Sequence, residues 1–172
     1  MKQSGVLVLA LSLLGGAGCD DNGVAPSNLP IVFTAQLSPA NEVPPVSNAE
    51  NTGSGAVQIT FNVTRDAAGV ITSGTVNFHF QLSGFPASAA VVGAHIHSAP
   101  AGVIGGVIVS TGIVAASPVS ATGGITSFTA TTIAVGGATI QAIVDNPAGH
   151  YFNVHSALNP GGFARGQLSR TL

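Results

Sequence analysis

Apolar and polar residues alternate along two neighbouring segments of the chain, residues 55–66 and 70–82. In the first, Val57, Ile59 and Phe61 stand at every second position, and Gln, Thr and Asn fill the positions between them. A period of two puts successive side chains on opposite faces of a β-strand, one face buried and the other solvated. Only Ala-Ala-Gly separates the segments, so the pattern predicts an antiparallel β-hairpin.

Six further segments have the β-branched and aromatic content of strands and are bounded by Gly, Pro and Ser. They are residues 31–38, 91–97, 106–114, 125–135, 150–157 and 163–170. Residues 137–149 instead space their apolar side chains as a short helix does, with Thr139 as the expected N-cap. The expected fold class is therefore all-β, an antiparallel β-sandwich or Greek-key barrel of about eight strands with one short helix.

The N-terminal nineteen residues have the order of a secretory signal peptide. Lys2 is followed by an apolar run, then by small residues and Cys19. The sequence Gly-Ala-Gly-Cys resembles the lipobox of bacterial lipoproteins, which implies that Cys19 carries the lipid. Residues 1–19 are thus predicted to be a lipoprotein signal peptide, and acyl chains on Cys19 would anchor the protein to a membrane of the cell envelope. An ordinary cleaved signal with an incidental cysteine is the alternative.

Residues 20–30 are rich in Asp, Asn, Pro and Ser, and this composition predicts a flexible tether. The patterned segments begin at Ile31, so residues 31–172 are predicted to form a single β-domain. Cys19 is the only cysteine of the chain. Packing without a disulfide must therefore hold this domain together.

Charged residues are scarce, at 6% of the 172, with four Lys and Arg, six Asp and Glu and a formal net charge of −2. Nucleic acid is excluded as an expected partner, because its binding depends on many basic contacts to phosphate. No arrangement of acid, base and nucleophile suits catalysis, so the chain is not expected to be an enzyme.

Three motifs occur in order along the chain: QLSPANEVPPV at 36–46, GAHIHSAPAGVIGGVIV at 93–109, and HYFNVHSALNPGGFARGQL at 150–168. In this order and at these spacings they resemble the CHRD domain, a family named after chordin and common in bacterial secreted proteins. The resemblance extends over residues 31–172. It implies an all-β extracellular domain of undefined molecular role, and it makes an extracellular protein or matrix ligand the expected partner.

Two of the five histidines, His95 and His97, lie one residue apart in a predicted strand. Residues two apart project from the same face of a strand, so the two imidazoles can share one metal ion. His155 alternates with the core-facing Phe152 and Val154 and is a candidate third ligand from another strand. Imidazole ligands without a thiolate suit copper or zinc.

Glu42, Asn153 and Arg165 are expected to lie around these histidines. Glu42 is a candidate fourth ligand or a carboxylate that orients a ring, unless it caps a turn. Asn153 shares the face of His155, and Arg165 is expected to donate to carbonyls near the Asn-Pro-Gly-Gly turn. In the alternative interpretation the same side chains form a buried hydrogen-bond network without metal. Both interpretations require the three histidines to lie close together.

The function expected from the sequence is a membrane-anchored, extracytoplasmic binding or structural module without enzymatic activity. The alternative is a copper- or zinc-binding protein that uses His95, His97 and His155 for metal storage, delivery or sensing. Of the other histidines, His79 is expected at the surface, because it lies on the polar face of its strand. His150 is expected to be partly buried.

Overall fold

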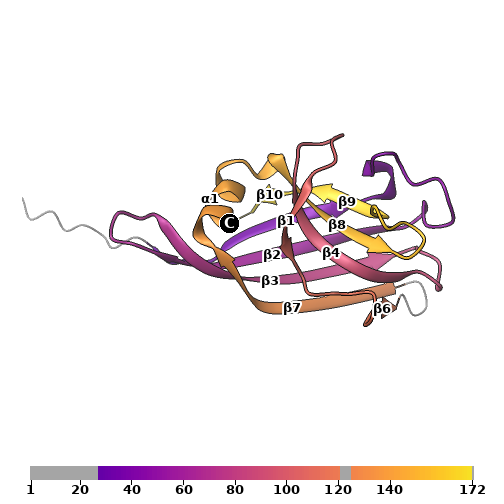
Figure 1. Ribbon diagram of the computed structural model, residues 1–172, viewed down its shortest axis with the longest axis horizontal. Coiled ribbons are helices and arrows are strands. Elements are labelled where there is room, and N and C mark those ends of the chain that lie inside the picture. The colour runs from indigo at the N-terminus through magenta and orange to yellow at the C-terminus, as the bar shows by residue number, and fades with distance from the viewer. Residues whose placement is uncertain (1–26, 121–124, 172) are drawn as a thin grey trace, which may run out of the picture.

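A computed structural model describes residues 27–120 and 125–171 and shows two antiparallel β-sheets packed face to face (Figure 1). The expected β-sandwich is confirmed, and the barrel alternative is wrong because the sheets do not close. The predicted signal peptide with Cys19 lies outside the described residues. Within the described ranges, no helix has the length and apolar character needed to cross a membrane.

The first sheet contains the predicted hairpin at its centre. Its strand order is β10-β1-β2-β3-β7. The strands span Ser169–Arg170, Ile31–Leu37, Ser54–Arg65, Ile71–Ser83 and Ile125–Gly136 in that order. In the β2–β3 hairpin, Val57 is opposite Phe80 and Phe61 is opposite Val76. The alternating apolar residues of the two strands therefore share one face.

The second sheet has the order β5-β4-β8-β9, with the short strand β6 paired to β4. These strands span Gly106–Ser110, Ala90–Ser98, His150–Ser156, Ala164–Gln167 and, for β6, Val119–Ser120. The hydrophobic core fills the space between the two sheets. Phe152 of β8 packs against Phe78 and Phe80 of β3, with ring centroids 5.7 and 5.8 Å apart. Because side chains alternate along a strand, the neighbours of Phe152 must point to the outer face of the second sheet.

Two predicted strands have different limits in the structure. The segment 163–170 divides into β9 and β10, which lie in different sheets, because Leu168 turns into the core between them. The segment 106–114 ends as a strand at Ser110, because Thr111 Oγ1 bonds to Ala94 O and Gly112 adopts a φ of 84°. With this division and the additional short strand β6, the described residues form ten strands instead of about eight.

The single α-helix, α1 (Gly137–Asp145), follows β7 directly, and Ile140 and Ile143 are buried against the sheet. Its N-cap is Gly136 and not Thr139, so the predicted cap is wrong. The reason is packing, because a Cβ at Gly137 would collide with the backbone of Ile71 and Thr72. A helix that starts at this close approach needs glycine there, and no capping side chain is used.

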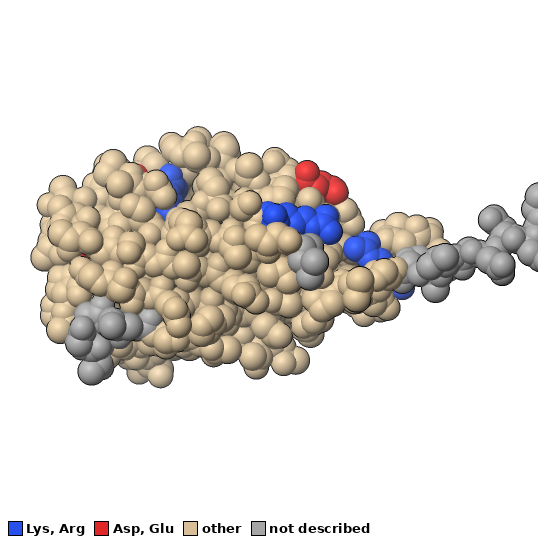
Figure 2. Space-filling view, turned by 180° about the vertical axis from the view of Figure 1, so that it is seen from behind, with Lys and Arg blue, Asp and Glu red and all other residues tan. Residues whose placement is uncertain are grey.

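Charged side chains are few on the face shown in Figure 2. In the described part of the chain, three of the seven charged residues are buried, namely Glu42, Glu50 and Arg165. Ionised side chains are rarely buried unless they are paired or serve a site. Glu42 and Glu50 lie in the connection between β1 and β2, and Arg165 lies on β9.

Candidate metal centre

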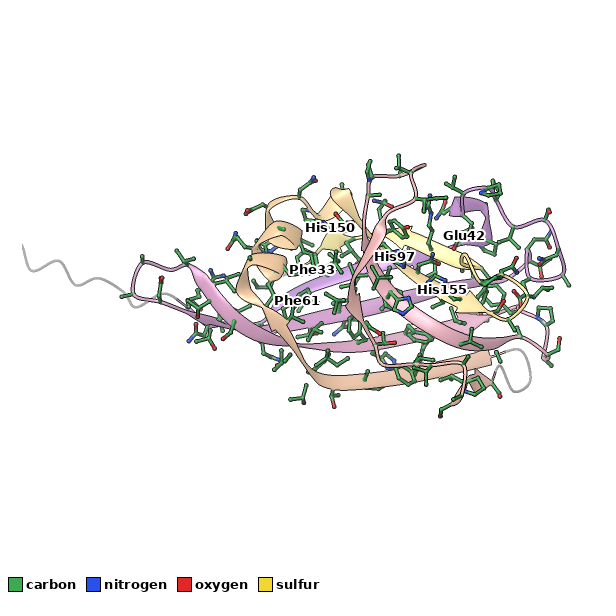
Figure 3. The ribbon with its side chains drawn as sticks, in the orientation of Figure 1. Phe33, Glu42, Phe61, His97, His150 and His155 are labelled. Carbon is green, nitrogen blue, oxygen red and sulfur yellow. The ribbon has the colours of Figure 1, made fainter. Side chains whose placement is uncertain are left out.

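Three histidines from two adjacent strands converge on the outer face of the second sheet. His95 and His97 lie on β4 and His155 on β8, and one ring nitrogen of each lies within 4.8 Å of the others. Their ring centroids are 4.9 to 5.7 Å apart. Figure 3 labels His97 and His155, together with Glu42 from the loop after β1. The convergence expected from the sequence is therefore present.

The register between β4 and β8 explains this convergence. Gly93 is opposite His155, and His95 is opposite Asn153. A Cβ at Gly93 would lie 3.1 Å from Cε1 of His95 and 3.7 Å from Cδ2 of His155. Gly93 thus leaves the space into which the two imidazoles lean toward each other.

Two of the histidines are oriented by backbone carbonyls from loops. Nδ1 of His97 lies 3.0 Å from the carbonyl oxygen of Gly105, and Nδ1 of His155 lies 3.0 Å from that of Pro160. A carbonyl oxygen only accepts, so in each ring Nδ1 carries the proton and Nε2 keeps a free lone pair. This is the arrangement that orients histidine ligands in metal sites.

Burial keeps these imidazoles neutral. Burial, together with the smaller effects of the nearby His155 and His97, lowers the pKa of His95 to about 4. Burial also lowers the pKa of His97 and of His155, against the opposing effect of their carbonyl hydrogen bonds. At neutral pH a metal ion therefore does not have to displace protons from these rings.

Tyr151 packs against the ring of His97, and Arg165 packs against the ring of Tyr151. The rings of His97 and Tyr151 are stacked at 4.8 Å with an interplanar angle of 9°, and the guanidinium of Arg165 lies 4.6 Å from the Tyr151 centroid. Tyr151 Oη also accepts a hydrogen bond from the N–H of Gly105, the residue whose carbonyl orients His97. Tyr151 thus fixes both the plane of this imidazole and its acceptor.

Arg165 donates to carbonyls, as expected, but these carbonyls are not in the Asn-Pro-Gly-Gly turn. Nε donates to Asn41 O at 2.6 Å and Nη1 to Val103 O at 3.0 Å. The partners come from the loop after β1 and from the loop between β4 and β5. Arg165 therefore joins two loops across the outer face of the sheet.

Glu42 and Asn153 lie beside the histidines without joining the group of three nitrogens. The N–H of Glu42 donates to Pro39 O at 3.2 Å and ends a short 3₁₀ turn, Pro39–Asn41. Burial raises the pKa of the Glu42 carboxyl to about 7, although Arg165 acts in the opposite direction. Asn153 donates weakly to Gly161 O at 3.4 Å.

The outer face is where buried polar atoms lack partners. In the described chain, the buried side-chain atoms without a hydrogen-bond partner are Glu42 Oε1, His95 Nδ1, His97 Nε2, Asn153 Oδ1, His155 Nε2 and Arg165 Nη2. They belong to the six residues that the sequence singled out. Buried polar groups are normally paired, so this concentration indicates a site for an ion or a ligand.

Sequence reasoning did not identify several supporting groups. The carbonyls of Gly105 and Pro160 have no side-chain signature, because every residue carries one. Glu50 is buried and accepts from Ser156 Oγ at 2.6 Å and from the side chain of Asn159, which fixes the turn that contains Pro160.

The two other described histidines, His79 and His150, behave as expected or nearly so. His79 is exposed, and His150 is buried with Nδ1 2.9 Å from Asn146 O.

Fold and site together define an all-β sandwich module with a candidate metal-binding face on its second sheet. The model of the CHRD domain family matches residues 33–168, which include all six residues above. The chain belongs to the CHRD domain family. Comparison with curated proteins and with solved structures finds no match.

Proposed function

We propose that this CHRD domain binds one copper or zinc ion through His95, His97 and His155. One observation carries the proposal: Nε2 of His97 and Nε2 of His155 are buried and lack a partner, and a carbonyl bond at Nδ1 orients each of these clustered rings. One ring nitrogen from each of the three histidines, His95 included, lies within 4.8 Å of the other two. Metal–nitrogen bonds of ~2.0–2.1 Å require the rings to close around the ion.

A metal ion accounts for this geometry better than a hydrogen-bond network does. Nε2 of His97 and Nε2 of His155 are both acceptors, and two acceptors repel each other unless a donor or a cation lies between them. The lowered pKa values of the rings make a bridging proton unfavourable. A divalent cation satisfies all three nitrogens at once.

The ligand set favours copper or zinc over harder cations. Imidazole suits both metals, and the general affinity order places copper(II) above zinc. Three protein ligands leave one position of a four-coordinate ion for water or an exchangeable ligand. An exchangeable position fits storage, delivery or sensing of the metal, and catalysis is not part of the proposal.

We also propose that the module is displayed outside the cytoplasm on a bacterial membrane. The support is the signal-peptide pattern of residues 1–19 and the lipobox-like sequence that ends at Cys19. In that location, metal ions in the cell envelope would have access to the site.

Contact with an extracellular protein or matrix is a second candidate function. The loop between β4 and β5 and the edge strand β5 expose four aliphatic side chains, Val103, Ile104, Val107 and Ile108. Grouped exposed apolar side chains favour an interaction surface. The same loop carries Gly105, so a partner bound there would lie beside His97.

Metal retention tests the main proposal. The purified protein is stripped with chelator, loaded with copper(II) or zinc and dialysed, and about one equivalent is expected to remain. His97→Ala is expected to abolish retention, while His79→Ala, which removes an exposed histidine, retains the metal. Absence of retention by the wild-type protein, or loss in both variants, would contradict the proposal.

A further inference from the structure

The outer face of the first sheet lies on the opposite side of the sandwich from the metal centre, and uncharged, mostly polar residues form rows across its strands. One row contains, from β1 to β7, Thr34, Gln58, His79 and Thr129. The next row contains, in the same strand order, Gln36, Ala56, Gln81 and Ser127. Seven of these eight residues are exposed and Thr34 is half-buried, so solvent reaches both rows.

Two adjoining hollows lie on this face around Ala56. One has a volume of about 200 Å³ and reaches Gln58, and the other has a volume of about 480 Å³ and reaches Ser127. Gln36, Ala56 and Gln81 line both hollows. Because the side chain of Ala56 is a single methyl group, it leaves a depression between three longer glutamine side chains. The larger hollow has the volume of a small-molecule site.

The three glutamines have side-chain amides that are available to a ligand. Among the residues that the structure describes, none of these amides has a hydrogen-bond partner. Each of the three residues is exposed, so its amide can be reached from solvent. An amide carries two N–H donors and a carbonyl acceptor on neighbouring atoms. Gln36, Gln58 and Gln81 thus present donors and acceptors together around one depression.

This face carries neither charge nor large apolar side chains. None of the seven charged residues in the described ranges belongs to either row or lines either hollow. The large exposed apolar side chains of the described chain also lie outside both rows. A charged polymer would therefore find no opposite charge here, and a lipid or an apolar protein surface would find no grouped apolar side chains. Neutral groups that both donate and accept hydrogen bonds match this face best.

We propose that the outer face of the first sheet binds a neutral polysaccharide, a linear chain of pyranose units with free hydroxyl groups. A hydroxyl both donates and accepts, so two neighbouring hydroxyls match the two ends of a side-chain amide. Adjacent strands lie about 4.8 Å apart, which is close to the length of one pyranose unit in an extended chain. The polysaccharide lies across the strands, so that successive sugars contact Gln58, His79 and Thr129. Groups that project from the sugars enter the depression at Ala56.

Polysaccharide binding does not depend on the metal centre. The three clustered histidines belong to the second sheet, and none of them lines either hollow. Native electrophoresis of the full chain in excess chelator therefore tests the proposal. The gels contain hydroxyethylcellulose or glycol chitin, which are neutral, or alginate, which is anionic. At least one neutral polymer is expected to slow the protein saturably, and alginate is expected to have no effect.

Removal of a single amide tests the contacts around the depression. Gln58→Ala and Gln81→Ala are each expected to weaken the binding of the neutral polymer about fivefold, because each removes the hydrogen bonds of one side chain. Gln141→Ala is the matched control, because Gln141 lies on α1 and lines neither hollow. Its binding of the neutral polymer is expected to equal that of the wild type.

Ala56→Ile fills the depression and leaves all three amides in place. Ala56 is exposed on a strand, where isoleucine is favourable, so the variant is expected to fold and to lose binding. Ala87→Ile, at an exposed alanine outside both hollows, is the control and should bind normally. Four results would overturn the proposal: no slowing by either neutral polymer, equal slowing by alginate, undiminished binding in Gln58→Ala and Gln81→Ala, or undiminished binding in Ala56→Ile.

Discussion

The two faces of strands β4 and β8 have the same backbone and opposite chemistry. On the inner face, Ala94, Ile96, Phe152 and Val154 are completely buried in the core. On the outer face, His95, Asn153 and His155 alternate with them and retain polar atoms without partners. The inner face is a packed apolar surface, whereas the outer face holds buried polar atoms that no described group pairs with, which is why we propose that it binds a metal ion. Stability should therefore depend on the first face and binding on the second.

The largest effect is expected from damage to the inner face. Phe152→Ala removes the ring that packs between Phe78 and Phe80, and should lower the free energy of unfolding by about 3–5 kcal/mol. Denaturant unfolding monitored by circular dichroism measures this loss. Folded Phe152→Ala protein should still retain one metal ion. Loss of less than about 1 kcal/mol would contradict the assignment of Phe152 to the core.

Metal should stabilise the protein through the outer face alone. With free metal at 100 times its Kd, the free energy of unfolding should rise by about 2.7 kcal/mol, and chelator should reverse the rise. His155→Ala should unfold at the same point with and without metal. Thermal unfolding of both proteins measures the difference, with His79→Ala as the control. Stabilisation of His155→Ala as large as that of the wild type would place the metal elsewhere.

Acid should destabilise the metal-free protein through its histidines. Their pKa values are lowered on folding, so below pH 6.5 the unfolded chain binds protons that the folded chain does not. The free energy of unfolding should therefore fall as the pH decreases from 6.5 towards 4.

Glu42 opposes this trend, because its pKa is raised to about 7 and the folded protein binds its proton more readily than the unfolded chain. Its contribution to stability is present at low pH and is lost as the pH rises through 7. The free energy of unfolding of Glu42→Gln should therefore fall more steeply than that of the wild type as the pH decreases. Chemical denaturation at a series of pH values compares the two proteins. A shallower decline in the variant would show that the predicted direction of the Glu42 contribution to stability is wrong.

The smallest effect is expected from the hydroxyl of Tyr151. Tyr151→Phe keeps the ring stacked on His97 but leaves the N–H of Gly105 without its acceptor. Metal affinity should fall about tenfold, and the free energy of unfolding by about 1 kcal/mol. A competition titration with a chromophoric chelator measures the affinity. Unchanged metal affinity would mean that the hydroxyl of Tyr151 is not needed to hold the Gly105 carbonyl in position.

Much of the fold was predictable because apolar and polar residues alternate along the strands, and this alternation is visible in the sequence. The β2–β3 hairpin follows from a period of two, and the same period placed His95 and His97 on one face of β4 and His155 on the polar face of β8. Proximity between β4 and β8 was not a consequence of spacing alone. It depends on the pairing of β4 with β8, two strands that lie far apart along the chain.

The unpredicted features depend on tertiary contacts. The helix begins at Gly137 because of a backbone approach to Ile71, and no local pattern encodes that approach. The acceptors that orient His97 and His155 are backbone carbonyls of loops, which lack any periodicity. Glu50 was missed because nothing in its loop indicates that Ser156 and Asn159 lie opposite it. The partners of Arg165 were misplaced for the same reason.

X-ray absorption spectroscopy of the copper-loaded protein tests the central claim most directly. Convergence of the three rings on one ion predicts three imidazole nitrogens at ~2.0 Å in the wild type and two in His95→Ala. A spectrum with fewer than three imidazoles in the wild type, or one unchanged by His95→Ala, would contradict the claim.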